Sequence, residues 1–197
     1  TTGGSDVWQT WTSSTDYALR LYQPGDPVSK TSNSDGDIVE FMCQWEYIPN
    51  SVFVFDANGG SGAMDNYTGK DATPWADYLK QIKSVVIGKD ITSIGNYAFA
   101  YATNIESLTF EEGSKLEKIG AAAFLYMVYT TEVTIPDTVT FIGNLSFAYC
   151  SRLASVFVPQ NVTLIYPQSF KKSSSVVLNV AEGTYAENYA KTNGVAY

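Results

Sequence analysis

The stretch VTIPDTVTFIGNLSFAYCSRLASVFVP, residues 133–159, decides the fold because its pattern recurs through the second half of the chain. Segments that begin at residues 91, 116 and 162 repeat it around a shared core, I-G-x-x-(A/S)-F. The phenylalanines of these cores follow one another at spacings of 25, 23 and 23 residues: Phe99, Phe124, Phe147 and Phe170. An isoleucine precedes each by five residues: Ile94, Ile119, Ile142 and Ile165. Regular apolar anchors at this period predict a solenoid, whose turns bury their apolar faces by stacking on one another.

Each unit also contains a short stretch in which apolar residues alternate with other residues, at 84–87, 107–110, 132–135 and 155–158. This period of two is typical of a strand with one face inward, so stacked units predict a parallel sheet. A glycine follows the isoleucine at Gly95, Gly120 and Gly143, whereas Tyr166 takes that place in the fourth unit. We interpret these glycines as tight backbone bends. The short, Ala-rich segments around the phenylalanines predict one helical or 3₁₀ turn per unit.

These units resemble the BspA-like leucine-rich repeat family, whose repeat runs roughly V-x-I-P-x-x-V-x-x-I-G-x-x-A-F-x-x-C-x-x-L. Residues 133–159 match nearly every anchor, including Cys150 and Leu153. The other units depart from the pattern at the Cys position, with Ala102, Met127 and Ser173, and at the Leu position, with Thr130. A P-W-x-x-Y element at residues 74–78 is similar to one that often precedes the first repeat in this family. The resemblance covers about residues 52–197 and implies a leucine-rich repeat solenoid in a bacterial surface or secreted protein.

The pattern divides the chain into four parts. Residues 1–51 match no repeat, and three alternating stretches there predict a β-rich N-terminal region: residues 8–11, 17–22 and 39–47. Residues 52–82 form the N-terminal cap of the solenoid, and residues 83–180 form the leucine-rich repeats. Residues 181–197 predict a helical C-terminal cap, because Thr184 and Glu187 have capping-box spacing and Asn193 with Gly194 provides a stop.

Composition excludes several classes of protein. The chain of 197 residues is 45% hydrophobic and 16% charged, which is too apolar and too weakly charged for intrinsic disorder. A formal net charge of −8 opposes the binding of nucleic acids and of anionic membrane surfaces. The longest apolar run, residues 121–129, is far shorter than the ~20 residues that span a bilayer, so we expect no membrane insertion.

The sequence offers little catalytic or metal chemistry, and we expect no enzyme activity, cofactor or metal. It contains no histidine, which removes the commonest general base and most zinc sites. Asn33, Asp35 and Asp37 hint at a calcium loop but lack its end ligands, so a solvated turn is the better interpretation. The two cysteines, Cys43 and Cys150, lie too far apart in sequence for a metal or redox pair, and we interpret them as buried thiols that are not bonded to each other.

The sheet face is the candidate binding surface. Between inward-pointing strand residues, one outward residue per turn lines up across the units: Val86, Thr109, Thr134 and Phe157. Solenoid proteins commonly use such a surface for partners. Two interpretations of Phe157 stay open, because it is either a binding hot spot or a residue that packs under a neighbouring segment.

A second candidate is an aromatic ladder that follows the repeat phenylalanine by two residues: Tyr101, Tyr126 and Tyr149. Such ladders bind sugars or proteins in some folds, but in repeats they more often seal the packing between turns, which is the interpretation we favour.

The resemblance, rather than any catalytic motif, implies the function. It indicates a non-catalytic adhesion or binding module, secreted or at the cell surface, whose partner is a host or cell-surface protein or a glycan. One alternative is a structural spacer that holds another domain away from the cell wall. The other is a carbohydrate-active enzyme with two carboxylates, for which Glu111 and Glu112 would lie on opposite faces of a continued strand.

Overall fold

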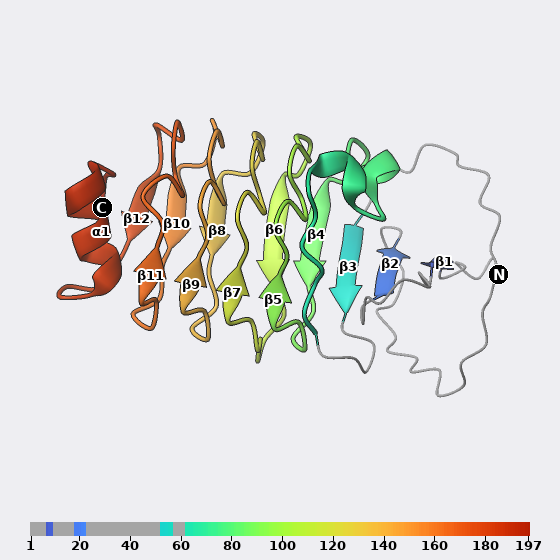
Figure 1. The fold of residues 1–197 in the computed structure, drawn as a ribbon, viewed down its shortest axis with the longest axis horizontal. Helices are drawn as coiled ribbons and strands as arrows, with labels where there is room; N and C mark the ends of the chain where they lie inside the picture. Colours follow the sequence, from blue (N-terminus) through green and yellow to red (C-terminus); the bar gives the residue numbers. More distant parts are fainter. Residues whose placement is uncertain (1–6, 10–17, 23–51, 57–61) are drawn as a thin grey trace.

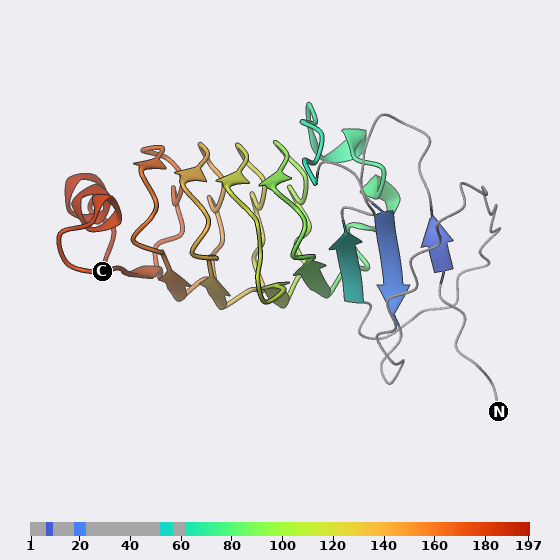
Figure 2. The same ribbon diagram turned by 90° about the horizontal axis from the view of Figure 1, so that it is seen from below.

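The computed structural model describes residues 7–9, 18–22, 52–56 and 62–197. These residues form a coil of stacked turns with two rows of parallel strands on opposite sides (Figures 1 and 2). A helix, α1 (Tyr185–Asn193), closes the C-terminal end of the coil. The predicted leucine-rich repeat solenoid is therefore confirmed.

The first row, here called the long-strand face, carries the predicted repeat strands together with one strand before them and one after. Its members are β3 (Val52–Asp56), β4 (Ser84–Ile87), β6 (Ser107–Phe110), β8 (Glu132–Thr134), β10 (Ser155–Phe157) and β12 (Val177–Asn179). Parallel ladders join β3, β4 and β6, and a separate parallel sheet joins β8, β10 and β12. The two N-terminal strands β1 (Val7–Gln9) and β2 (Ala18–Tyr22) extend the first of these sheets in antiparallel fashion, with β2 paired to β3.

The second row is the short-strand face, which the repeat pattern did not predict as a sheet. It consists of four strands of two residues: β5 (Ser93–Ile94), β7 (Lys118–Ile119), β9 (Phe141–Ile142) and β11 (Leu164–Ile165). They form one continuous parallel sheet in that order. Their isoleucines point inward, where all four are at most 2% exposed.

Between the two faces, the repeat phenylalanines form the predicted continuous ladder. Consecutive ring centroids lie 5.4, 5.3 and 5.6 Å apart from Phe99 to Phe170, and the rings are stacked. Trp75 extends the stack at one end, 5.7 Å from Phe99, and Tyr189 covers it at the other end, 6.2 Å from Phe170. Because each ring covers the next, the core is one column that runs through every turn.

The repeat glycines have a different role from the predicted bends. A Cβ added at Gly120 would lie 2.7 Å from the backbone nitrogen of Asn96, and one at Gly143 would lie 2.6 Å from that of Ala121. Consecutive turns approach so closely there that the Gly120 N–H donates to the Ile94 carbonyl at 2.8 Å. Close backbone approach, rather than an unusual backbone conformation, explains these glycines.

The Ala-rich segments also differ from the prediction, since they are successive turns and not helical or 3₁₀ segments. Two residues in each of the first three units adopt positive φ angles: Tyr97 and Tyr101, Ala122 and Tyr126, and Leu145 and Tyr149. Each segment donates backbone hydrogen bonds to the next unit, such as Phe99 N–H to Ala123 O at 2.8 Å. These bonds between turns offset the cost of a left-handed conformation at residues other than glycine.

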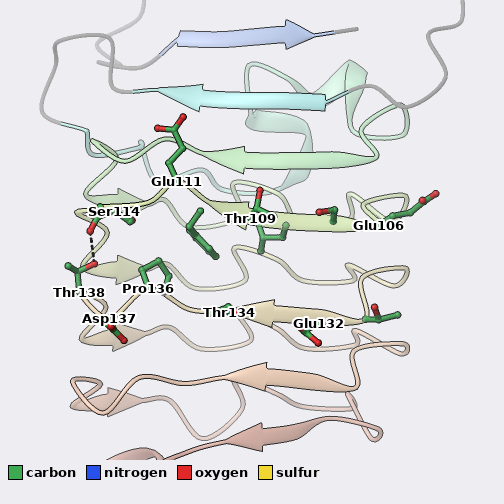
Figure 3. A pocket seen from close by; sticks show the side chains of 14 residues that line it. Glu106, Thr109, Glu111, Ser114, Glu132, Thr134, Pro136, Asp137 and Thr138 are labelled. Carbon is green, nitrogen blue, oxygen red and sulfur yellow. Dashed lines mark hydrogen bonds between the residues drawn. The ribbon is translucent and has the colours of Figure 1, made fainter. Parts of the chain in front are cut away.

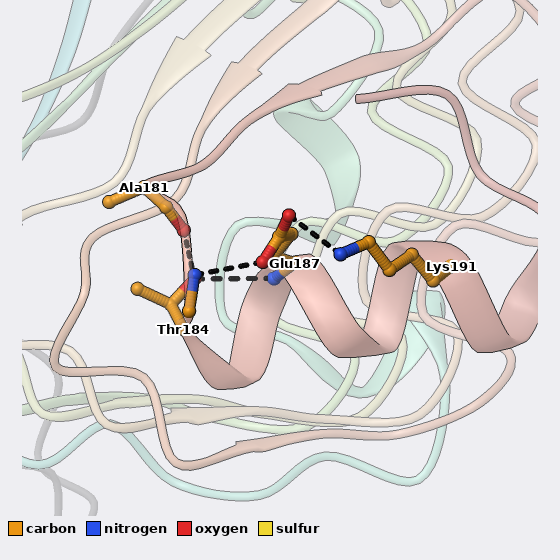
Figure 4. Close-up of polar contacts among 5 residues, drawn as sticks. Ala181, Thr184, Glu187 and Lys191 are labelled. Carbon is orange, nitrogen blue, oxygen red and sulfur yellow. Dashed lines mark hydrogen bonds and ion pairs between the residues drawn. The ribbon is translucent and has the colours of Figure 1, made fainter.

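Both ends of the coil are closed by caps. In the N-terminal cap, which includes the 3₁₀ helices η1 (Lys70–Ala72) and η2 (Ala76–Tyr78), buried Trp75 donates its indole N–H to the Ala98 carbonyl at 2.7 Å. At the other end, the Thr184 hydroxyl accepts the Glu187 N–H (Figure 4). Gly194 ends α1 with a left-handed φ of 66°. The predicted N-cap and stop are therefore confirmed. Hydrogen bonds from Lys191 and from the Gly183 N–H lower the pKa of the Glu187 carboxyl.

Several sequence predictions fall on residues outside the described ranges. These are the strand at 39–47, the turn with Asn33, Asp35 and Asp37, and the thiol of Cys43. Cys150 is a free, fully buried thiol, and burial raises its pKa to about 12. A thiol with so high a pKa is unreactive at neutral pH while the chain stays folded.

A candidate binding groove in the long-strand face

The candidate site lies where the long-strand face is divided. β6 and β8 are neighbours in the coil, yet no ladder joins these two described strands. A groove of about 730 Å³ follows the division, and its walls are β6, β8 and the loops that continue from them (Figure 3). The hydroxyl of Thr138 closes one end of the groove by donating to the Ser114 carbonyl at 3.2 Å.

A two-residue insertion accompanies the division. The inward isoleucine follows the first residue of the long strand by 12 positions in the unit that starts at Ser107. In the units that start at Ser84 and Glu132 it follows by 10 positions. The extra residues lie in the loop that follows β6, where Gly113 has a φ of 75° and nothing lies near its Cα on the side where a Cβ would be. The short-strand face shows no such break, because β7 pairs with both β5 and β9.

A proline contributes to the same division. One turn earlier, the Glu111 N–H donates to the Ile87 carbonyl at 2.9 Å and joins the end of β6 to β4. The equivalent residue after β8 is Pro136, which has no N–H to offer to the Phe110 carbonyl. Pro159 holds the same position after β10, and β10 nevertheless pairs with β8. The proline alone therefore does not prevent a ladder from forming. The insertion is the feature that distinguishes β6 and β8 from the strands that do pair.

Carboxylates dominate the electrostatics of the groove. Its lining includes four acidic residues and no Lys or Arg: Glu106, Glu111, Glu132 and Asp137. Glu111 accepts the Lys89 N–H at 3.0 Å, and Glu106 forms a long ion pair with Lys83 at 3.8 Å. Neither Glu132 nor Asp137 forms an ion pair within the described part of the chain.

The predicted row of outward residues crosses this groove. Val86 lies opposite Thr109 in the β4–β6 ladder, and Thr134 lies opposite Phe157 in the β8–β10 ladder. Thr109 and Thr134 line the groove from its two sides (Figure 3). Phe157 is 44% exposed, which is unusual for a large apolar side chain on a sheet. The geometry of the row agrees with the prediction, while its role in binding stays a prediction.

The tyrosine ladder forms as predicted. The rings of Tyr101 and Tyr126 stack at 4.8 Å, and those of Tyr126 and Tyr149 stack at 4.6 Å. A sugar ring would need an open aromatic face, but the central ring is covered on both sides by its neighbours. This arrangement favours the structural interpretation of the ladder.

Sequence reasoning missed the groove carboxylates as a group, because it considered only Glu111 among them, and only as part of an enzyme site. The repeat pattern predicts a uniform parallel sheet, and such a sheet has no groove between its second and third repeat strands. The available signal was the 25-residue spacing between Phe99 and Phe124, because the spacings that follow are 23 residues. That spacing locates the insertion, but only the three-dimensional arrangement brings the acidic residues of two turns together.

Other chemistry finds little support in the described residues. No group of three His, Cys, Asp or Glu side chains there is arranged to hold a metal ion. No described helix has the length and apolar character needed to cross a membrane. The absence of a cofactor stays a prediction.

The comparisons with known proteins agree with the repeat pattern. Residues 77–190, more than half of the chain, match the family model described as BspA type Leucine rich repeat region (6 copies). The chain belongs to this family. No curated protein is similar enough to count as a match.

Among the solved structures that match, the first described below shows the same fold. A leucine-rich repeat protein from Eubacterium ventriosum ATCC 27560 is 25% identical with a TM-score of 0.50, over 66% of this chain and 40% of that one. A T. pallidum Leucine Rich Repeat protein is 18% identical with a TM-score of 0.38, over 68% and 77% of the two chains. A leucine rich cell surface protein from Faecalibacterium prausnitzii A2-165 is 16% identical with a TM-score of 0.35, over 90% and 55%. The chain spans less than half the length of the Eubacterium ventriosum protein.

Proposed function

We propose that this chain is a non-catalytic binding module, secreted or displayed at a bacterial cell surface, that recognises a protein or glycan through its long-strand face. The observation that carries the proposal is the groove of about 730 Å³ in that face. Repeat solenoids commonly bind partners on an extended sheet surface, and a concave site with convergent polar groups is the usual form of a binding site. Membership of the BspA type family supports the cell-surface or secreted location.

Exposed residues beside the groove also support binding. Phe157 lies next to Thr134 on the same face, with nearly half of its surface open to solvent. Large aromatic side chains are enriched among residues that contribute most to binding energy. The absence of histidine from the whole chain supports a non-catalytic role, because histidine is the commonest general base.

The test is a binding screen of the whole chain against extracellular matrix proteins and glycans, repeated with two variants. Thr134→Arg places a long side chain in the groove, and Phe157→Ala removes the exposed aromatic ring. We expect a ligand whose binding is lost with the first variant and weakened at least about tenfold with the second, while both melting temperatures stay within a few degrees of wild type. The variant Glu112→Gln, whose side chain lies outside the groove lining, is the control.

Two results would contradict the proposal. A ligand that binds all variants equally would place recognition elsewhere on the chain. Failure of every ligand in the panel to bind would favour the structural spacer, in which the repeats only separate other parts of a surface protein.

A further inference from the structure

The charge of the groove restricts its occupant. All four ionisable side chains in its lining are acidic, and the chain as a whole has a formal net charge of −8. Glu132 and Asp137 come from the same turn and have no ion-pair partner within the described residues. A cationic occupant would be attracted to these carboxylates, whereas an acidic partner would be repelled by them.

The carboxylates lie at the two ends of the groove rather than at one point. Figure 3 shows Glu106 and Glu132 near the start of the strands and Asp137 beyond their other end. Glu111 also lies beyond that end, but its carboxylate is directed toward the preceding turn, where it accepts the Lys89 backbone N–H. Along the chain, five residues separate Glu106 from Glu111 and Glu132 from Asp137, which corresponds to roughly 16 Å at the rise of an extended strand. A single small cation cannot meet both ends at once. An extended peptide of five or six residues has the matching length.

The floor of the groove offers hydrogen bonds as well as charge. The Glu132 N–H is bonded to no carbonyl of the preceding turn, whereas the equivalent amides of Ser107 and Ser155 both donate across the sheet, at 3.2 Å. Pro136, the equivalent of Glu111 one turn later, has no N–H to offer to the Phe110 carbonyl. One unpaired donor and one unpaired acceptor in the same groove favour an occupant whose polar side chains both donate and accept, as those of Ser and Thr do.

The width of the groove decides how such a peptide lies. Cα atoms of β6 and β8 come within 8 Å of one another, whereas a strand inserted between them would require about 9.5 Å. The occupant therefore lies over the division and does not complete the sheet. Its side chains, rather than its backbone, enter the space between the two strands.

We infer that the groove between β6 and β8 binds an extended segment of a partner protein that carries Lys or Arg side chains four or five residues apart. This inference rests on the proposed function and names the chemistry of the partner. The two basic side chains meet the carboxylates at the two ends, and the segment between them lies over Thr109 and Thr134.

The probe for the test is the fluorescein-labelled hexapeptide Lys-Ser-Thr-Ser-Thr-Lys, titrated with the whole chain and followed by fluorescence anisotropy. The matched peptide Lys-Lys-Ser-Thr-Ser-Thr has the same composition and charge but places both lysines at one end. We expect the first peptide to bind about tenfold more tightly, because it alone meets both pairs of carboxylates. Its affinity should fall as salt is added, since exposed ion pairs are screened.

Neutral variants of the groove complete the test. Glu132→Gln with Asp137→Asn keeps the shape of the groove and removes two charges, so the dissociation constant of the first peptide should rise about tenfold. Glu112→Gln removes a charge from the neighbouring loop outside the lining and should leave the affinity unchanged. The inference would be overturned by equal affinity of the first peptide for all variants, by equal affinity of the two peptides, or by no binding at about 1 mM. It would also be overturned if spermine, a small polycation with no peptide backbone, bound more tightly than the first peptide.

The inference and the proposed function fail in different ways. Suppose that a panel ligand no longer binds the Thr134→Arg variant but still binds the Glu132→Gln, Asp137→Asn variant with unchanged affinity. This result would support the proposed function and would contradict the inference that the partner is a basic segment. A basic peptide that binds equally well after Thr134→Arg would contradict both.

Discussion

On the short-strand face, β5, β7, β9 and β11 form one unbroken ladder, whereas on the long-strand face the ladder stops at β6 and resumes at β8. The same turns of the coil build both faces. The insertion after β6 therefore separates two strands on one side without separating the turns on the other.

The core explains how both arrangements occur in one molecule. The phenylalanine stack passes under the division without a change, since Phe99 and Phe124 lie 5.4 Å apart and Phe124 and Phe147 lie 5.3 Å apart. Stability in a solenoid comes from contacts between neighbouring turns, and these contacts are complete in the core and in the short-strand face. The division is consequently a surface feature, which leaves the groove free to serve binding.

The largest expected effect concerns the continuous core beneath the division. Phe124→Ala removes a fully buried ring from the middle of the stack and should lower the free energy of unfolding by about 3–5 kcal/mol. Chemical denaturation measures this loss. Phe157→Ala is the control from the long-strand face, and its cost should stay below about 1 kcal/mol because the ring is 44% exposed. Similar costs for the two variants would contradict the solenoid core.

The second prediction tests the unbroken face. Gly120→Ala would place a methyl group 2.7 Å from backbone atoms of the preceding turn, beside the hydrogen bond from Gly120 N–H to Ile94 O. We expect a loss of about 2–3 kcal/mol, because backbone cannot move aside as a side chain can. Gly69→Ala, where nothing lies within 4 Å, should change stability by less than about 0.5 kcal/mol. If Gly120→Ala caused little loss of stability, the neighbouring turns would be less closely packed than described.

The third prediction compares two serines at equivalent positions, each just before a repeat phenylalanine. The Ser169 hydroxyl donates within the buried turn, to Gly143 O at 2.8 Å or Tyr166 O at 2.7 Å, whereas the buried Ser146 hydroxyl has no hydrogen-bond partner among the described residues. Ser169→Ala should cost about 1 kcal/mol, and Ser146→Ala should be neutral or stabilising. Thermal unfolding of both variants measures the difference. A loss at Ser146 equal to that at Ser169 would show that its hydroxyl is bonded after all.

The fourth prediction concerns the cause of the division. Deletion of Glu112 and Gly113 restores the 23-residue spacing and should change the free energy of unfolding by no more than about 1 kcal/mol. The shortened loop should allow β6 and β8 to approach, so binding of the lysine-ended hexapeptide should weaken at least about tenfold. Unchanged binding would show that Pro136 or another feature maintains the groove.

The repeat sequence predicted the core and the C-terminal helix well because both depend on local patterns. The apolar anchors recur at nearly constant spacing, and the N-cap of α1 needs only Thr184 and Glu187 at the right separation. Neither the role of Gly120 nor the short-strand face could be predicted in the same way, since both arise from the distance between neighbouring turns. The groove depends on whether a ladder forms between β6 and β8, which is a property of two turns together. Its carboxylates consequently looked like ordinary surface residues in the sequence.

Amide hydrogen exchange tests the division itself most directly. Residue-resolved exchange of the free chain should show the Glu132 N–H exchanging at least about a hundredfold faster than the Ser107 and Ser155 N–H groups, which occupy the same position in the neighbouring turns and donate across the sheet at 3.2 Å. The three amides share the first position of their strands, so hydrogen bonding is the main difference between them. Equal protection of all three would show that the long-strand face is continuous in solution and that the groove does not exist there.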